Sequence, residues 1–177
     1  MVVAGARVTL REFRFEDAPQ VHQYASDPRV VNHLNWGPNA WGDTTAFLAL
    51  VKAEAEASPR VSYQLAITEN STGLVMGAVR LAIESPRHRR AAIGYVLAAS
   101  RWGLGYGTEA AQLMVQWAIR DAGMHRIEAT CDPANHGSRR VLEKIGLQYE
   151  GYRRHDFLVR GHWRDSLMFA LIADPAD

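Results

Sequence analysis

The sequence predicts an α+β fold: one mixed, mostly antiparallel sheet of about seven strands with helices on its faces. Three apolar, β-rich runs follow one another at 63–68, 74–83 and 91–97, joined by short polar turns, which is typical of an antiparallel meander. Beyond the meander, helix-forming segments alternate with further runs of strand length. The chain has 177 residues, with no internal repeat, low-complexity tract or linker, so residues 1–177 are predicted to form a single domain.

The first half contains a strand and two helices before the meander. Residues 8–13 are predicted to form the first strand, and a helix is expected to start at Asp17 as its N-cap and to stop near Pro28. Residues 30–38 are expected to be a loop or a broken helical turn. A second helix is predicted over 43–57 with Asp43 as its cap.

The second half is organised around residues 91–121, which are predicted to form a strand, a glycine loop and a helix. From Trp102 to Gly107 every second residue is glycine, and Thr108 opens a run of good helix formers. Such a loop directs unpaired N–H groups and the positive end of the helix dipole toward one point, which favours an anion. The residues alone leave three interpretations open: a tight turn without a ligand, a dinucleotide loop with Asp132 as its acidic partner, or a pyrophosphate loop for coenzyme A.

The elements after this helix are short. A strand is predicted at 126–131, a short helix at 138–145, a strand at 148–154, an excursion at 157–164 and a last strand at 166–172. Asn135 and Ser138 stand at the start of the short helix, where capping alone would explain both residues.

Composition excludes several classes of protein. The net charge is +1 with 22% charged residues, so no nucleic acid or membrane partner is expected. No apolar run approaches the roughly 20 residues that a membrane helix needs. The single cysteine, Cys131, allows no internal disulfide and fits a reducing compartment. A cytoplasmic protein without a metal site is predicted.

Five motifs occur in order and carry a family resemblance. They are Gly94-Tyr95-x-Leu97, Trp102-Gly103-x-Gly105-Tyr106-Gly107-Thr108-Glu109-Ala110, Asn135-x-x-Ser138-x-x-x-Leu142-Glu143-Lys144-x-Gly146, Glu150-Gly151 and Gly161-x-Trp163-x-Asp165. With these motifs the chain resembles the GCN5-related N-acetyltransferases (GNAT), and more narrowly the branch of the bacterial RimJ/RimL enzymes, which acetylate the N-termini of ribosomal proteins. Residues 7–18 resemble the same branch, so the likeness spans nearly the whole chain.

The resemblance implies an acetyl-CoA-dependent N-acetyltransferase that transfers the acetyl group directly to an amine. The 91–97 strand would splay from its neighbour, and the N–H groups around Val96 would polarise the thioester carbonyl. Asn135 would contact the cofactor, and Ser138 would lie near the sulfur and protonate the departing thiolate. The remaining implied cofactor contacts are Tyr95, Val96 and Leu97 along the pantetheine, and Trp102, Gly103, Leu104, Gly105, Tyr106, Gly107 and Thr108 around the pyrophosphate.

The sequence leaves the general base open. Residues 91–97 contain no carboxylate, so Glu84 at the end of the preceding strand is the first candidate. His155 and Asp156 come next, and a water chain would also serve an amine that is partly neutral at pH 7. By resemblance, His33, Trp36, His155 and Asp156 are expected to contact the acceptor.

The acceptor is predicted to be the α-amine of a protein or peptide. The loops expected around it, 30–38 and 157–164, have only Asp156 and Asp165 as nearby acids, whereas a polycation would need several. A small amine (a polyamine, an amino acid or an aminoglycoside-like amine) remains the alternative substrate. A non-catalytic acyl-CoA-binding regulatory module is the alternative of another class, and a homodimer is left open.

Overall fold

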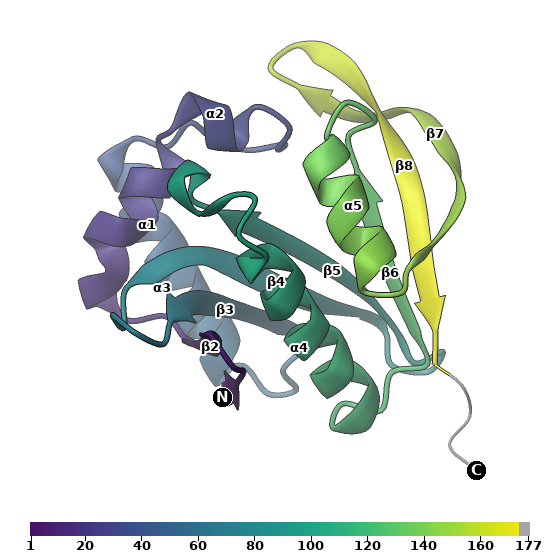
Figure 1. Ribbon diagram of the computed structural model, residues 1–177, viewed down its shortest axis with the longest axis horizontal. Coiled ribbons are helices and arrows are strands. Elements are labelled where there is room, and N and C mark those ends of the chain that lie inside the picture. Colours follow the sequence, from purple (N-terminus) through teal and green to yellow (C-terminus); the bar gives the residue numbers. More distant parts are fainter. Residues whose placement is uncertain (174–177) are drawn as a thin grey trace.

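The computed structural model describes residues 1–173 and contains a twisted sheet of eight strands flanked by helices (Figure 1). The strands are β1 (Val2–Ala4), β2 (Val8–Glu12), β3 (Ser62–Glu69), β4 (Val75–Ser85), β5 (Arg90–Leu97), β6 (Arg126–Cys131), β7 (Gln148–Val159) and β8 (His162–Ile172). The α-helices are α1 (Ala18–Ala25), α2 (Pro28–Val31), α3 (Trp41–Glu56), α4 (Tyr106–Arg120) and α5 (His136–Lys144). Two short 3-10 helices are η1 (Phe15–Asp17) and η2 (Ala99–Arg101).

The sheet order is β1-β2-β3-β4-β5-β6-β8-β7, and every neighbouring pair is antiparallel except β5 and β6. This confirms the predicted mixed, mostly antiparallel sheet. The extra strand is β1, whose three residues pair with β2 and are too few to show an alternating pattern in the sequence.

The predicted excursion at 157–164 is instead the tip of a long hairpin. Val159 of β7 pairs with His162 of β8, which leaves a two-residue turn of Arg160 and Gly161. Both turn residues have positive φ, 50° and 80°, as the twist of a two-residue hairpin favours.

Helices cover both faces of the sheet. α4 and α5 lie on one face and α1 and α3 on the other (Figure 1). The larger core lies under α4, whose inward side is made of small and apolar residues at helical spacing. These residues are Ala110, Ala111, Met114, Val115 and Ala118, all buried. Three of the five are alanines, whose small side chains let α4 pack closely on the sheet.

One predicted helix cap is confirmed in position and another is moved. Asp17 is the N-cap residue of α1, as predicted, but its carboxylate accepts hydrogen bonds from the Arg14 N–H (2.8 Å) and from both Arg11 terminal nitrogens (2.7 and 2.8 Å) and not from an N–H of α1. α3 begins at Trp41 and not at Asp43, which is its third residue and accepts from the Ala40 N–H at 2.8 Å. In both cases the carboxylate satisfies a donor on the preceding turn.

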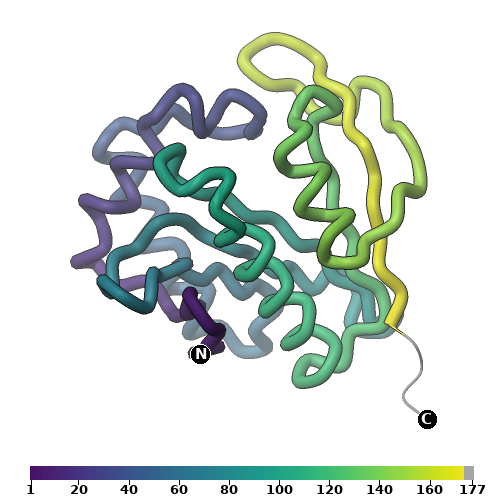
Figure 2. The backbone as a smooth tube through the Cα atoms, in the orientation of Figure 1, coloured from purple at the N-terminus to yellow at the C-terminus, as the bar shows by residue number. Residues whose placement is uncertain are grey.

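The tip of the β7–β8 hairpin and the segment after α2 approach each other at one end of the molecule (Figure 2). Within residues 1–173, no helix is both long and apolar enough to cross a membrane.

Candidate active site

The site is built around an opening in the sheet between β5 and β6. The two strands pair in parallel only over three positions, from Arg90 opposite Arg126 to Ala92 opposite Glu128. Beyond these positions the strands diverge, as predicted from the resemblance (Figure 1). The same offset carried along both strands places Val96 and Asp132 at one level, on opposite sides of the opening.

The glycine loop lies at the open end of β5. Gly103 and Gly105 have φ of 75° and 85°, and Gly105 is the N-cap of α4. The backbone N–H groups from Gly103 to Thr108 donate to no backbone or side-chain acceptor in the described part of the chain. Six free donors at a helix N-terminus fit the pyrophosphate of coenzyme A, whose oxygens would accept these bonds.

A buried carboxylate that the sequence did not reveal anchors the loop. Glu69, at the end of β3, accepts from both terminal nitrogens of Arg101 (3.0 Å each), from the Tyr106 hydroxyl (2.9 Å) and from the Thr72 hydroxyl (2.9 Å). The hydrogen bonds from Tyr106 and Thr72, together with the Arg101 charge, hold the pKa of Glu69 below its usual range. The anchoring carboxylate is therefore ionised at neutral pH.

The aromatic side chains of the loop are also engaged in supporting it. The Trp102 indole donates to the Leu97 carbonyl at 3.0 Å, and the Tyr106 hydroxyl is held by Glu69. Arg7 donates to the Leu104 carbonyl at 2.9 Å and pairs with Glu109 at 2.9 Å. These side chains fix the loop, which leaves its amides as the groups that can bind an anion.

Ser138 lies beside the opening and contacts β5 through a tyrosine. Asn135 caps α5 by accepting the Ser138 N–H at 3.0 Å, so the backbone of Ser138, and not its hydroxyl, takes part in the cap. The Tyr95 hydroxyl lies 3.0 Å from both the Ser138 Oγ and the Ser138 carbonyl oxygen. Burial raises the pKa of Tyr95, so this hydroxyl stays protonated. The Ser138 hydroxyl takes no part in capping α5, and its hydrogen-bonding partner is the neutral Tyr95 hydroxyl.

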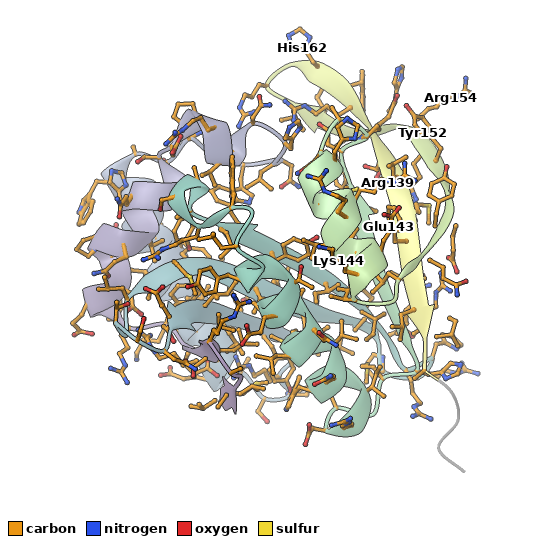
Figure 3. The ribbon with its side chains drawn as sticks, viewed as in Figure 1. Arg139, Glu143, Lys144, Tyr152, Arg154 and His162 are labelled. Carbon is orange, nitrogen blue, oxygen red and sulfur yellow. The ribbon has the colours of Figure 1, made fainter. Side chains whose placement is uncertain are left out.

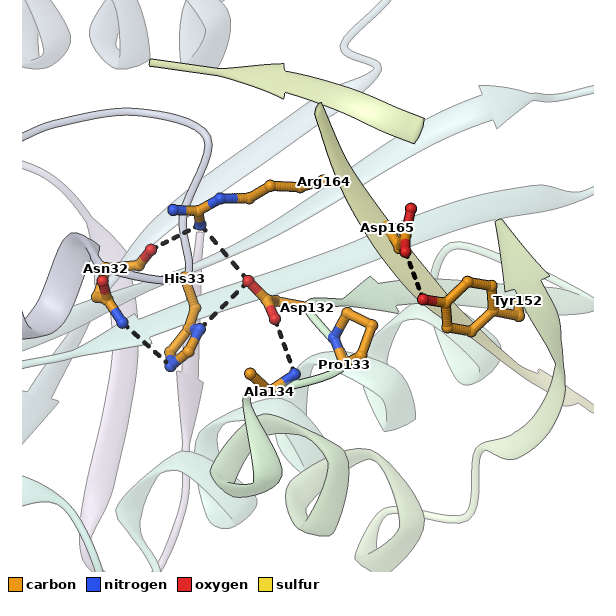
Figure 4. A pocket seen from close by; sticks show the side chains of 8 residues that line it. All are labelled: Asn32, His33, Asp132, Pro133, Ala134, Tyr152, Arg164 and Asp165. Atoms are coloured by element: carbon orange, nitrogen blue, oxygen red, sulfur yellow. Dashed lines mark hydrogen bonds and ion pairs between the residues drawn. The ribbon is translucent and has the colours of Figure 1, made fainter. Parts of the chain in front are cut away.

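A pocket of about 370 Å³ opens on the other side, at Asp132 (Figure 4). It is lined by Asn32, His33, Asp132, Pro133, Ala134, Tyr152, Arg164 and Asp165. A smaller pocket of about 150 Å³ shares His33, Asp132, Arg164 and Asp165 and continues along the end of β6 to Thr130. The two pockets together therefore lie on the β6 side of the opening.

Two carboxylates face this pocket in different surroundings. The Asp132 Oδ2 lies 3.3 Å from the His33 Nδ1 and 3.5 Å from an Arg164 terminal nitrogen. Asp165 accepts from the Tyr152 hydroxyl and from the His155 N–H, and these two bonds hold its pKa below the ordinary value. A cationic amine would therefore meet an ionised carboxylate in this pocket.

The structure does not bring the predicted base candidates to this pocket. Glu84 lies at the closed end of the opening, 3.5 Å from Arg90. Val96 lies six positions beyond Arg90 along β5, about 20 Å at the rise of a strand. This distance removes the first candidate from the site.

The remaining predicted acceptor contacts lie on the rim of the pocket or outside it. His155 stacks on Trp163 and is exposed on the irregular part of β7. Asp156 has one buried oxygen without a hydrogen-bond partner among residues 1–173, and its other oxygen lies 3.8 Å from Arg153. The Trp36 carbonyl accepts from Arg160, and neither pocket includes the Trp36 side chain. Of the four predicted contacts, His33 alone lines the pockets described above.

Comparison with known proteins gives the family. Residues 7–148 match the model of the acetyltransferase (GNAT) domain. The chain is 30% identical over 170 residues to an uncharacterized N-acetyltransferase, p20, of Bacillus licheniformis, covering 94% of this chain and 93% of the relative. It is 24% identical over 164 residues to the spermidine N(1)-acetyltransferase of Escherichia coli K12, covering 93% and 85%. Among solved structures it resembles Mycobacterium smegmatis RimJ in complex with CoA-disulfide, with a TM-score of 0.85, 28% identity, and coverage of 98% and 88%.

The sheet opens between the parallel strands β5 and β6, and a loop with unpaired backbone N–H groups lies at the open end of β5. This arrangement is typical of acyl-CoA-dependent transferases. The chain belongs to the GNAT acetyltransferase family, whose members use acetyl-CoA, and it is an N-acetyltransferase. Membership of this family excludes the interpretation of the loop as part of a dinucleotide-binding fold.

Proposed function

We propose that this N-acetyltransferase acetylates the α-amine of a protein or peptide by direct transfer from acetyl-CoA. The observation that carries the proposal is that a site for an anion and a site for a cation lie on the two sides of the opening between β5 and β6. The free amides of 103–108 lie at the end of β5, and the pocket with Asp132 and Asp165 lies at the end of β6. An anionic cofactor and a cationic amine can therefore meet at the level of Val96.

Each group of the chain has a part in the reaction. When bound, acetyl-CoA supplies a thioester whose carbonyl carbon forms a bond to the amine nitrogen while its bond to sulfur breaks. The amides from Gly103 to Thr108 would hold the pyrophosphate, and the backbone around Val96 would hold the pantetheine and polarise the carbonyl. The Ser138 hydroxyl would give its proton to the departing sulfur.

Direct transfer is favoured over an acetylated enzyme by the state of the one cysteine. Cys131 is the last residue of β6 and is buried. Burial raises the pKa of its thiol to about 11, so almost none is the nucleophilic thiolate at neutral pH. The amine of the acceptor is the nucleophile that the site is built to receive.

The charges of the pocket support a peptide over a polyamine. The sequence prediction named Asp156 and Asp165 as the nearby acids, whereas the carboxylates that line the pocket are Asp132 and Asp165. The Asp132 carboxylate already contacts Arg164 and His33, whereas within residues 1–173 no basic side chain forms an ion pair with Asp165. One such carboxylate suits a single ammonium group better than a polycation. Similarity to the E. coli spermidine enzyme keeps spermidine as the second candidate.

The test is release of the coenzyme A thiol with a panel of amines. We expect a short peptide with a free N-terminal alanine to give a higher kcat/KM than spermidine or an aminoglycoside. The same peptide with a blocked N-terminus is the control and should release no thiol. Preference for spermidine would replace the peptide proposal by the small-amine one. Binding of acetyl-CoA without thiol release for any amine would instead indicate a regulatory acyl-CoA-binding module.

A further inference from the structure

A histidine and an aspartate from distant parts of the chain form a pair at the pocket. His33 follows α2 and Asp132 follows β6, and the His33 Nδ1 lies 3.3 Å from the Asp132 Oδ2 (Figure 4). A neutral imidazole with its proton on Nδ1 would present that N–H to this carboxylate. The Nε2 atom then keeps its lone pair, and it lies 3.4 Å from Nδ2 of Asn32, an amide donor that fits this tautomer.

The pair is held in place from several sides. The other oxygen of Asp132 accepts the Ala134 N–H at 2.8 Å, which fixes the carboxylate on its turn. Arg164 donates to the Asn32 carbonyl at 2.6 Å, next to His33 in the chain. Arg160, at the hairpin tip, donates to the carbonyls of Val31 (3.2 Å) and Gly37 (2.7 Å), on either side of His33. Two arginines of the hairpin therefore clamp the segment that bears the imidazole.

The pair also has the right location for an amine. Asp132 directly follows β6, at the level of Val96 when the register of β5 and β6 is extended, and His33 lines both pockets beside Asp132. Its side chain is 28% exposed, so a bound acceptor or one water can reach it. His162 by contrast projects outward from the hairpin tip (Figure 3).

We propose that His33 is the general base of the reaction and that Asp132 is its positioning residue. The proposal rests on the proposed function, since a base is needed only if an amine is acetylated. Of the three protons on the acceptor ammonium, one leaves through the His33 Nε2 to solvent and one stays on the product amide. The third replaces the proton that Ser138 gives to the sulfur.

The test uses His33→Asn, because the Asn amide can keep the donor to Asp132 while the basic nitrogen is lost. With the N-terminal alanine peptide as acceptor, we expect kcat to fall by about 10²-fold or more, with acetyl-CoA affinity and melting temperature unchanged. His88→Asn is the matched control, because His88 is exposed on the β4–β5 turn, at the closed end of the opening. It should leave kcat unchanged.

Two further variants separate catalysis from structure. His33→Ala should lose kcat to a similar degree and recover part of it when imidazole is added to the buffer, which a loop-packing role would not allow. Asp132→Asn should lower kcat about tenfold or more while the KM for acetyl-CoA stays unchanged.

The outcomes are distinguishable. Suppose that the wild-type enzyme is active. An unchanged kcat in His33→Asn, or a loss in His33→Ala that imidazole does not relieve, would then overturn the base assignment. Either result would leave the proposed function standing. A wild-type enzyme that releases no thiol with any amine would refute the proposed function, and the base assignment would fall with it.

Discussion

The binding role of the glycine loop can be tested at Gly105, which caps α4 with φ of +85°. A valine there would occupy a conformation that costs an L-residue roughly 1–2 kcal/mol, and more for a β-branched side chain. The added Cβ would lie 3.1 Å from an Arg7 terminal nitrogen, so the guanidinium that holds the Leu104 carbonyl would have to shift by only a few tenths of an ångström. Backbone strain, and not a clash, is therefore the main effect of the substitution.

This strain changes affinity because the free loop can relieve it. If the loop of Gly105→Val relaxes, its amides turn away from their common point, and binding has to restore the strained conformation. A cost of about 1.4 kcal/mol or more corresponds to a rise in the acetyl-CoA Kd of at least tenfold. Titration calorimetry with acetyl-CoA, beside a melting curve for each variant, measures both quantities.

A matched glycine separates strain from binding. Gly123 has φ of +67°, no atom within 4 Å of an added Cβ, and a position at the other end of α4. Gly123→Val should lower the melting temperature by a similar amount and leave the Kd unchanged. If folded Gly105→Val bound acetyl-CoA as tightly as the wild type, the loop amides would not be the pyrophosphate site.

Three other predictions follow from single contacts. Ser138→Ala should lower kcat by about 10²-fold with acetyl-CoA affinity retained. Asn135→Ala should lower the free energy of unfolding by about 1 kcal/mol because the cap of α5 is lost. Equal melting temperatures for Asn135→Ala and the wild type would contradict the capping role. Gly77→Ala would place a Cβ 2.1 Å from the Val96 carbonyl oxygen. It should therefore destabilise the fold by about 1–3 kcal/mol and weaken acetyl-CoA binding. If the variant bound acetyl-CoA with the Kd of the wild type, β5 would not be the strand that holds the cofactor. Burial alone would raise the pKa of Asp17, but its arginine and backbone hydrogen bonds outweigh burial and lower the pKa below its ordinary value of 3.8. The stabilisation from this carboxylate is therefore present above its ordinary pKa and is lost as pH falls through the lowered pKa of the folded state; in acid denaturation Asp17→Asn should flatten that loss.

Local chemistry in the sequence was enough for much of the fold and for the turn and helix start at the glycine loop. The meander follows from alternating apolar runs and polar turns, and the helix after the glycine loop follows from its spacing of small apolar residues. The cap at Asn135 was likewise predicted from residues a few positions apart, and the structure confirms it. Each of these features depends on neighbours within one or two turns of chain.

The acceptor side was decided by tertiary structure. Glu84 was a reasonable base candidate from its place in the sequence, but only the register of β4 on β5 shows that it lies at the closed end. The hydroxyl contact between Tyr95 and Ser138 joins residues 43 positions apart, and the bond from Arg160 to the Gly37 carbonyl spans 123. The pairing of His33 with Asp132 arises because the hairpin holds the segment after α2 against the end of β6. Such contacts depend on how separate elements pack together, and residues far apart in the chain carry no local pattern that specifies them.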